Sequence, residues 1–139
     1  MSSGPIIETQ LRVRYAETDA MGIVYHTNYI IWFEVGRGEY FWQQGMNYAD
    51  WEQQGVYFPV AEVSARFLAP ARYGDLVTVR TWVQEKRSRE VTFAYEVLMA
   101  ETGQKLATGW TKHLCVNGKG QVVIIPSKLS DLLTPREGR

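Results

Sequence analysis

The chain has 139 residues, a length typical of one domain with one hydrophobic core, and we expect residues 1–139 to form that domain. Fifteen basic and fifteen acidic side chains give a formal net charge of zero, which argues against nucleic-acid binding, since that function usually needs a basic stripe. A lone cysteine, no charged-then-apolar opening and no apolar run of about 20 residues favour a cytoplasmic protein without membrane insertion.

The first half of the chain predicts one strand, one loop and two helices. Residues 1–6 are small and mostly polar, so we expect them to fray. Residues 10–15 alternate between apolar and polar side chains, which is the period of a half-buried strand. After a mixed loop, residues 28–44 contain no proline and stop at Gly45, which predicts a helix roughly 25 Å long. A shorter helix is expected over residues 48–54.

The second half of the chain predicts four consecutive strands. They are expected over residues 56–68, 76–85, 90–100 and 105–116, with turns at 86–89, 101–104 and 117–120. The long helix is apolar on most sides, so most of its faces should be buried. An antiparallel meander that curls around this helix would cover it, and its remaining exposed side would need a partner subunit. The pattern predicts an α+β fold.

A continuous segment from Val13 to Tyr29, VRYAETDAMGIVYHTNY, carries a specific family resemblance. The resemblance continues through Trp32, Phe33, Glu34 and Arg37, and then through Phe67, Pro70 and residues 72–75. The chain resembles the 4-hydroxybenzoyl-CoA thioesterase-like hotdog family, particularly its bacterial acyl-CoA thioesterase branch. This resemblance implies a sheet of about five antiparallel strands around one central helix. It also implies a homodimer, often paired into a tetramer, with active sites at subunit interfaces.

The resemblance assigns roles to particular residues. Asp19 matches the catalytic carboxylate, as nucleophile or general base, and His26 matches the position where a backbone N–H polarises the thioester carbonyl. Tyr15 is expected to be a third catalytic residue, as a core aromatic of the first strand whose hydroxyl reaches the site. Substrate binding is expected at the following positions: Gly22, Val24, Tyr25, Thr27, Pro59 and, for the nucleotide end of CoA, Arg87, Ser88 and Arg89.

Thioester hydrolysis suits such a site because CoA thiol is a good leaving group. A carboxylate that attacks or activates water, together with pre-aligned donors for the oxyanion, suffices without a serine triad. The unpaired N–H groups and the positive dipole end of the helix could supply those donors. No metal or redox cofactor is therefore expected, and CoA is part of the acyl-CoA substrate. Two histidines show no metal-ligand spacing, and His113 and Cys115 are interpreted as packed strand residues.

Several alternatives stay open. Without the motif, Asp19 would be interpreted as a turn residue. Glu17 is either a solvated loop charge or part of the site, and Glu34 with Arg37 is expected to form a local ion pair. A hotdog hydratase or dehydratase and a noncatalytic acyl-CoA-binding module are the rival functions. The sequence leaves the acyl chain undetermined, along with the choice between nucleophilic and general-base chemistry and between dimer and tetramer.

Overall fold

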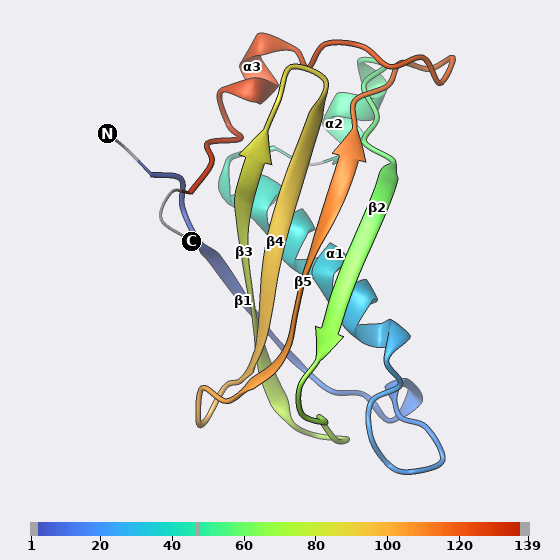
Figure 1. Ribbon diagram of the computed structural model, residues 1–139, viewed down its shortest axis with the longest axis vertical. Helices are drawn as coiled ribbons and strands as arrows, with labels where there is room; N and C mark the ends of the chain where they lie inside the picture. The colour runs from blue at the N-terminus through green and yellow to red at the C-terminus, as the bar shows by residue number, and fades with distance from the viewer. Residues whose placement is uncertain (1–2, 47, 137–139) are drawn as a thin grey trace.

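The computed structural model describes residues 3–46 and 48–136, which form one antiparallel sheet backed by a long helix (Figure 1). The elements in chain order are β1 (Ile7–Arg12), the short 3-10 helix η1 (Tyr15–Glu17), α1 (Thr27–Gln43), α2 (Tyr48–Gln53), β2 (Val60–Phe67), β3 (Leu76–Lys86), β4 (Glu90–Met99), β5 (Lys105–Leu114) and α3 (Ser127–Ser130). The α+β hotdog arrangement expected from the sequence is therefore confirmed.

The strand order β1-β3-β4-β5-β2 corrects the expected meander. Strands β3, β4 and β5 do follow one another as hairpins, but β2 does not pair with β3. It pairs instead with β5, with Val63 opposite Thr111 and Phe67 opposite Ala107. The chain after β2 crosses to the other side of the sheet, where β3 lies between β1 and β4. Consequently β2 is an edge strand, and its backbone is available for pairing.

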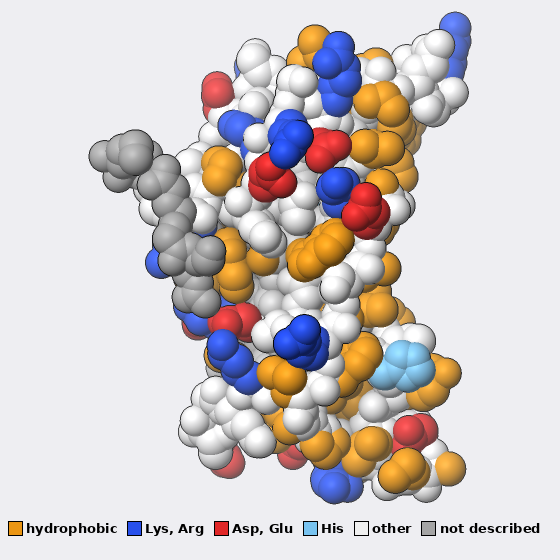
Figure 2. Space-filling view, in the orientation of Figure 1, with side chains coloured by type: hydrophobic (Ala, Val, Ile, Leu, Met, Phe, Trp, Pro, Cys, Tyr) orange, Lys and Arg blue, Asp and Glu red, His pale blue; other side chains and the backbone are white. Residues whose placement is uncertain are grey.

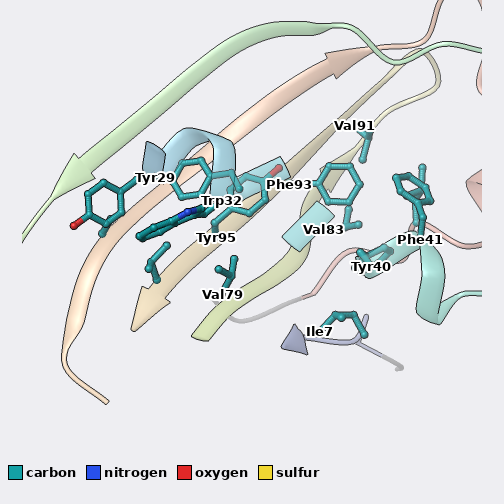
Figure 3. Packing of buried hydrophobic residues seen from close by; sticks show 14 of the residues in the cluster. Ile7, Tyr29, Trp32, Tyr40, Phe41, Val79, Val83, Val91, Phe93 and Tyr95 are labelled. Atoms are coloured by element: carbon teal, nitrogen blue, oxygen red, sulfur yellow. The ribbon is translucent and has the colours of Figure 1, made fainter. Parts of the chain in front are cut away.

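Helix α1 lies across one face of the sheet and supplies much of the core (Figures 1 and 3). One stripe is buried, namely Tyr29, Trp32, Phe33, Gly36, Tyr40 and Phe41. The Phe33 and Tyr95 rings stack with centroids 4.4 Å apart. A side chain at Gly36 would collide with Thr81, so glycine lets the helix approach β3 closely. This chain alone buries only one stripe of the helix, and Ile31, Val35 and Trp42 stay exposed on it.

The opposite face of the sheet is polar and mixed in charge. Figure 2 shows acidic and basic side chains interspersed there. Arg80 and Lys105 both contact the buried Glu96 carboxylate, at 2.8 and 3.1 Å. This face carries no large single-sign patch, which agrees with the balanced composition.

Three local expectations are corrected by the structure, and one alternative that stayed open is decided. The first strand ends at Arg12, so Tyr15 lies in η1 and is 77% exposed instead of belonging to the core. Gly4 is buried and donates to Pro135 O, so residue 4 does not fray, whereas residues 1 and 2 lie outside the described part. Glu17 is buried. Within the described residues Arg37 forms no ion pair with Glu34, because its guanidinium donates to Tyr48 and Tyr95.

Candidate active site

A tight loop between η1 and α1 carries Asp19. Asp19 Oδ1 accepts hydrogen bonds from the N–H groups of Met21 and Ile23, at 2.9 and 3.4 Å, while Asp19 N donates to Ile23 O at 2.9 Å. Gly22 has φ 81°, a conformation that favours glycine, and its N–H donates to Asp19 O. The carboxylate thus has the Asx-turn contact of a turn residue, but Oδ2 accepts no hydrogen bond within the described chain.

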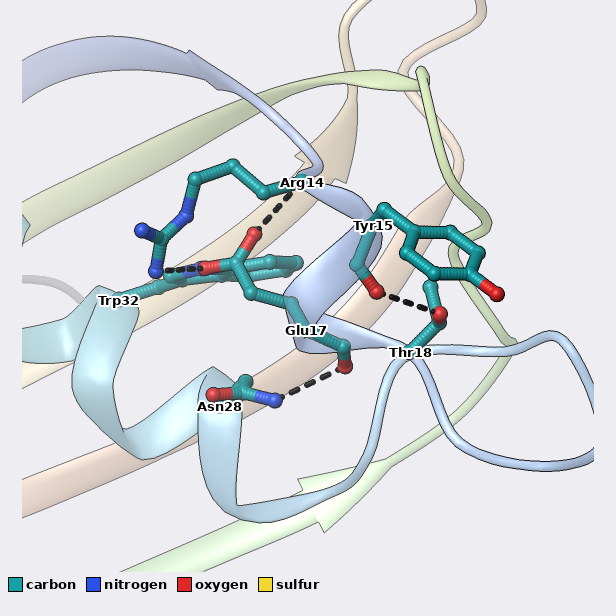
Figure 4. Close-up of polar contacts among 6 residues, drawn as sticks. All are labelled: Arg14, Tyr15, Glu17, Thr18, Asn28 and Trp32. Atoms are coloured by element: carbon teal, nitrogen blue, oxygen red, sulfur yellow. Dashed lines mark hydrogen bonds and ion pairs between the residues drawn. The ribbon is translucent and has the colours of Figure 1, made fainter.

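Glu17 anchors this loop to the helix (Figure 4). Its carboxylate accepts from the backbone N–H of Arg14 at 2.8 Å and from Trp32 Nε1 at 2.9 Å, and its backbone O accepts from Asn28 Nδ2 at 2.9 Å. Burial alone would raise the pKa of Glu17, but the hydrogen bonds from Arg14 and Trp32 outweigh burial and lower that pKa. Glu17 is therefore a buried anion that joins the loop to the first turns of α1.

The start of α1 presents donors beside the same loop. His26 is the residue that precedes the helix, and no hydrogen bond among the described residues uses its backbone N–H. The His26 ring packs between Tyr25 and Phe67, with centroids 4.6 and 5.7 Å away. The positive dipole end of a 17-residue helix adds to the attraction of this free N–H for an oxyanion.

A cavity of about 300 Å³ adjoins the helix start. Its walls come from the loop, from α1 and from the segment after β2: Ile23, Val24, His26, Tyr29, Phe67, Leu68, Ala69 and Pro70. A bridge between Thr18 and Val24 closes the base of the loop, so the Asp19 loop and the cavity share the residues around Ile23. The cavity is mostly apolar, and the described residues that line it include two titratable side chains, His26 and Tyr29.

The structure brings together one group of the residues expected from the sequence and separates another. Asp19, Gly22, Val24, Tyr25, His26 and Thr27 all lie within the loop and the helix start. Tyr15 lies nearby, but its ring packs edge-on against Tyr73 and points away from the Glu17–Trp32 contact (Figure 4). Pro59 precedes β2 at the far end of that strand from Phe67, and lines a different cavity with Tyr48 and Phe58.

The turn that contains Arg87, Ser88 and Arg89 also lies at the far end of the sheet (Figure 1). Asp75, just before β3, bonds to Val13 beside the site loop, whereas the turn follows Lys86 at the other end of β3. An 11-residue strand separates the two by roughly 33 Å at about 3.3 Å per residue. One chain therefore does not bring this turn to its own Asp19.

Sequence reasoning missed the role of Glu17 and the buried contacts of Arg37. A signal for Glu17 existed, because the indole N–H of Trp32 needs a hydrogen-bond acceptor when the ring is buried. His113, interpreted as structural, is 1% exposed and bonds to Thr111 and to Phe58 O. Among the described residues no group of three or more His, Cys, Asp or Glu side chains could hold a metal ion, and no helix is long and apolar enough to cross a membrane.

Comparison with known proteins identifies the class that this fold and site define. The family model of the thioesterase-like superfamily matches residues 13–133, so the chain belongs to that superfamily. The putative acyl-CoA thioesterase YneP of Bacillus subtilis is 35% identical over 112 residues, which cover 81% of this chain and 80% of YneP.

Two solved structures are similar throughout. The hypothetical protein TT1821 of Thermus thermophilus is 41% identical with a TM-score of 0.86, covering 91% of this chain and 95% of that one. The DHNA-CoA thioesterase of Staphylococcus aureus is 34% identical with a TM-score of 0.84, covering 91% of this chain and 85% of that one. The family expected from the Val13–Tyr29 segment is thereby confirmed.

Proposed function

We propose that this chain is an acyl-CoA thioesterase in which Asp19 drives thioester cleavage and the start of α1 stabilises the oxyanion. One observation carries the assignment of roles: one short closed loop is flanked by the Asp19 carboxylate and the His26 N–H, and among residues 3–46 and 48–136 neither Asp19 Oδ2 nor this N–H has a hydrogen-bond partner. Thioester hydrolysis needs an attacking oxygen and a donor for the carbonyl oxygen, which these two groups supply.

The reaction can follow two routes from this arrangement. In the first, Asp19 attacks the thioester carbon, the C–S bond breaks, the CoA thiolate leaves, and water hydrolyses the resulting mixed anhydride. In the second, Asp19 removes a proton from a water molecule that attacks directly. Hydrolysis in water labelled with oxygen-18 distinguishes the two routes, since only the anhydride route can transfer the labelled oxygen to the Asp19 carboxylate. Neither route draws on a metal or redox group, so we propose that a chelator leaves turnover unchanged.

The substitution Asp19→Asn tests the proposal. The amide keeps the size and the loop contact of Oδ1 but has no basic or nucleophilic oxygen, so thiol release should fall roughly 10³-fold. The matched control is Glu101→Gln in the exposed β4–β5 turn, which should hydrolyse acyl-CoA at the wild-type rate. Hydrolysis by the Asp19 variant within threefold of the wild-type rate would contradict the role assigned to Asp19. If the wild type and the Asp19 variant both bind CoA and neither hydrolyses acyl-CoA, a noncatalytic binding module is favoured.

We also propose a cytoplasmic homodimer, assembling to a tetramer, that pairs through β2. The edge strand exposes Val60, Val63 and Phe67 at 50%, 47% and 45%, and α1 beside it exposes Ile31 and Val35. Unpaired apolar edges of this kind associate readily, and two-fold pairing of antiparallel edges would extend the sheet across both copies. Light scattering measures the assembly, and Val63→Lys should shift it toward the monomer.

The proposed pairing assigns Arg87, Ser88 and Arg89 to the partner's active site. Mixing Asp19→Asn chains with chains carrying Arg87→Ala and Arg89→Ala tests this assignment. In each hybrid dimer one of the two active sites is intact, because it combines the unchanged Asp19 loop of one chain with the unchanged arginine turn of the other. Refolding the mixture should restore activity to roughly a quarter of wild type. No recovery above the sum of the two inactive parents would show that the turn serves no partner site.

A further inference from the structure

The peptide that joins Tyr25 to His26 carries the backbone N–H that the candidate site would present to an oxyanion. The carbonyl O of Tyr25 accepts a hydrogen bond from the backbone N–H of Asn28 at 2.9 Å. The described residues contain no cis peptide bond, so the carbonyl and the N–H of this peptide point in opposite directions. Because Tyr25 O points into the first turn of α1, the His26 N–H points away from that turn.

Three hydrogen bonds close a ring around this peptide. Tyr25 N donates to Glu17 O, Tyr25 O accepts from Asn28 N, and Asn28 Nδ2 donates to Glu17 O, each at 2.9 Å. Figure 4 shows the side-chain bond, in which the Asn28 amide reaches from the start of α1 to the Glu17 carbonyl. A carbonyl oxygen has two lone pairs, and the ring uses both of those on Glu17 O. The ring therefore fixes Glu17, Tyr25 and Asn28 relative to one another.

The two reacting groups of the proposed mechanism are attached to different members of this ring. Asp19 follows Glu17 by two residues, and His26 follows Tyr25 directly. The other two bonds of the ring both involve Tyr25, so the Asn28 side chain is the bond that braces the helix against the loop. A displacement of a catalytic group by about 1 Å can cost about 10²-fold in rate, so this brace matters for turnover.

Helix capping does not account for the Asn28 side chain. An asparagine at a helix start ordinarily accepts a hydrogen bond from a backbone N–H of its own helix. Here Oδ1 accepts no hydrogen bond within residues 3–46 and 48–136, whereas Nδ2 donates to Glu17, which lies outside α1. The side chain is also partly exposed, so the core does not require its shape. The feature that the structure uses is its N–H donor.

We propose that Asn28 is a positioning residue for the proposed thioesterase reaction and sets the distance between the Asp19 carboxylate and the His26 N–H. Its amide is turned to Glu17 O, so it acts through the loop and the donor peptide instead of touching the substrate. Removing a whole oxyanion donor costs about 10²–10³ in rate, and a displaced donor keeps part of that stabilisation. Loss of the amide should therefore lower kcat by about 10- to 100-fold and change KM by less than about twofold.

The variants Asn28→Ala and Asn28→Asp separate positioning from stability. Both lack the donor, and the aspartate carboxylate also repels Glu17 O, so kcat of Asn28→Asp should be no higher than that of Asn28→Ala. The aspartate charge lies in the first turn of α1, where the helix dipole stabilises it. The thermal midpoint of Asn28→Asp should therefore be no lower than that of Asn28→Ala. A purely structural role would instead make the more stable variant the faster one.

Thiol release from butanoyl-, dodecanoyl- and benzoyl-CoA gives kcat and KM for each protein. The matched control is Asn117→Ala, which removes an asparagine amide from the turn after β5, at the other end of the sheet from the Asp19 loop (Figure 1). This amide side chain bonds to Gln121 and to the N–H of Lys119, so the control should lower the thermal midpoint and leave kcat unchanged.

The role of Asn28 depends on the proposed function, and the same assay tells their failures apart. If the wild type is active and the Asn28 variants keep kcat within about twofold, the role of Asn28 is overturned and the thioesterase function stands. The same holds if kcat follows the thermal midpoint across the three variants, or if KM changes as much as kcat. No hydrolysis of any of the three substrates by the wild type would remove the function, and the role of Asn28 with it.

Discussion

Replacing Glu17 with Gln should destabilise the protein far more than a neutral exchange on its surface. Oε1 accepts from Arg14 N and Oε2 from Trp32 Nε1, and the residue is 5% exposed. Gln has the same shape but carries an NH₂ group in place of one oxygen. Whichever way the amide is turned, that NH₂ faces a donor, so one buried N–H loses its acceptor.

The expected loss follows from these contacts. An unsatisfied buried donor costs about 1–3 kcal/mol, and the remaining bond weakens because its acceptor is no longer charged. The Arg14 guanidinium adds little, since its side chain is 73% exposed and its ion pair at 3.4 Å is screened by solvent. Together these give a loss of roughly 2–4 kcal/mol in the free energy of unfolding. Because Glu17 also holds the Asp19 loop, kcat should fall more than KM rises.

Urea unfolding followed by tryptophan fluorescence measures the loss, and the slope m should stay constant if only stability changes. Glu62→Gln is the matched control, since its carboxylate is half exposed and 3.5 Å from Lys112, and it should change stability by about 0.5 kcal/mol or less. A Glu17→Gln loss as small as that of the control would refute the reasoning. It would mean that the loop is held by its backbone contacts alone.

Two other substitutions have defined outcomes. Burial, together with the nearby charge of Arg37, lowers the pKa of His113 from 6.5 to about 4. Between these two pH values the unfolded chain binds more protons than the folded chain, so the stability of the fold decreases as the pH drops from about 6.5 to 4. This pKa difference corresponds to roughly 3 kcal/mol in the free energy of unfolding. Urea unfolding at several pH values should show that the stability of the wild type falls with decreasing pH in this range, whereas the stability of His113→Gln does not. The same pH dependence in both proteins would contradict the prediction. A side chain at Gly109 would collide with Ser64 O and the Phe33 ring, so Gly109→Ala should cost about 2 kcal/mol or more in thermal unfolding, whereas Gly118→Ala, in open space, should not.

The local elements were predictable because their signals are local. Gly45 and Gly55 have φ of 88° and 81° and follow α1 and α2, and Gly45 is the stop that the sequence predicted for the long helix. The hairpins β3–β4 and β4–β5 join neighbours in the chain, so alternation and turn residues were enough. The place of β2 depends on pairing with β5, about 45 residues later, and on a crossover that no local pattern encodes.

In the candidate site, too, local contacts were predictable from the sequence and long-range contacts were not. The loop from Asp19 to His26 is one short segment, so a motif predicted which residues come together there. The sequence left Glu17 open between a solvated loop charge and part of the site, because a charge in a loop is usually solvated and its partner Trp32 is 15 residues away in the chain. Arg37 was paired with Glu34 by spacing alone, but a hydroxyl from β4 competes successfully for the same guanidinium. Spacing along a helix cannot show a partner that comes from the sheet.

The crossover after β2 also explains how an arginine turn could serve a site at the other end of the sheet. Because β2 lies at the edge, two copies paired there in antiparallel fashion would have their sheets reversed relative to each other. The partner's β3–β4 turn would then lie toward the same end as the Asp19 loop of the first copy, although within one chain the two are roughly 33 Å apart. A meander with β2 beside β3 would instead have left β5 as the edge strand on this side of the sheet. In the proposed dimer, the pairing of β2 with β5 would thus connect the topology to a shared active site and make activity dependent on assembly.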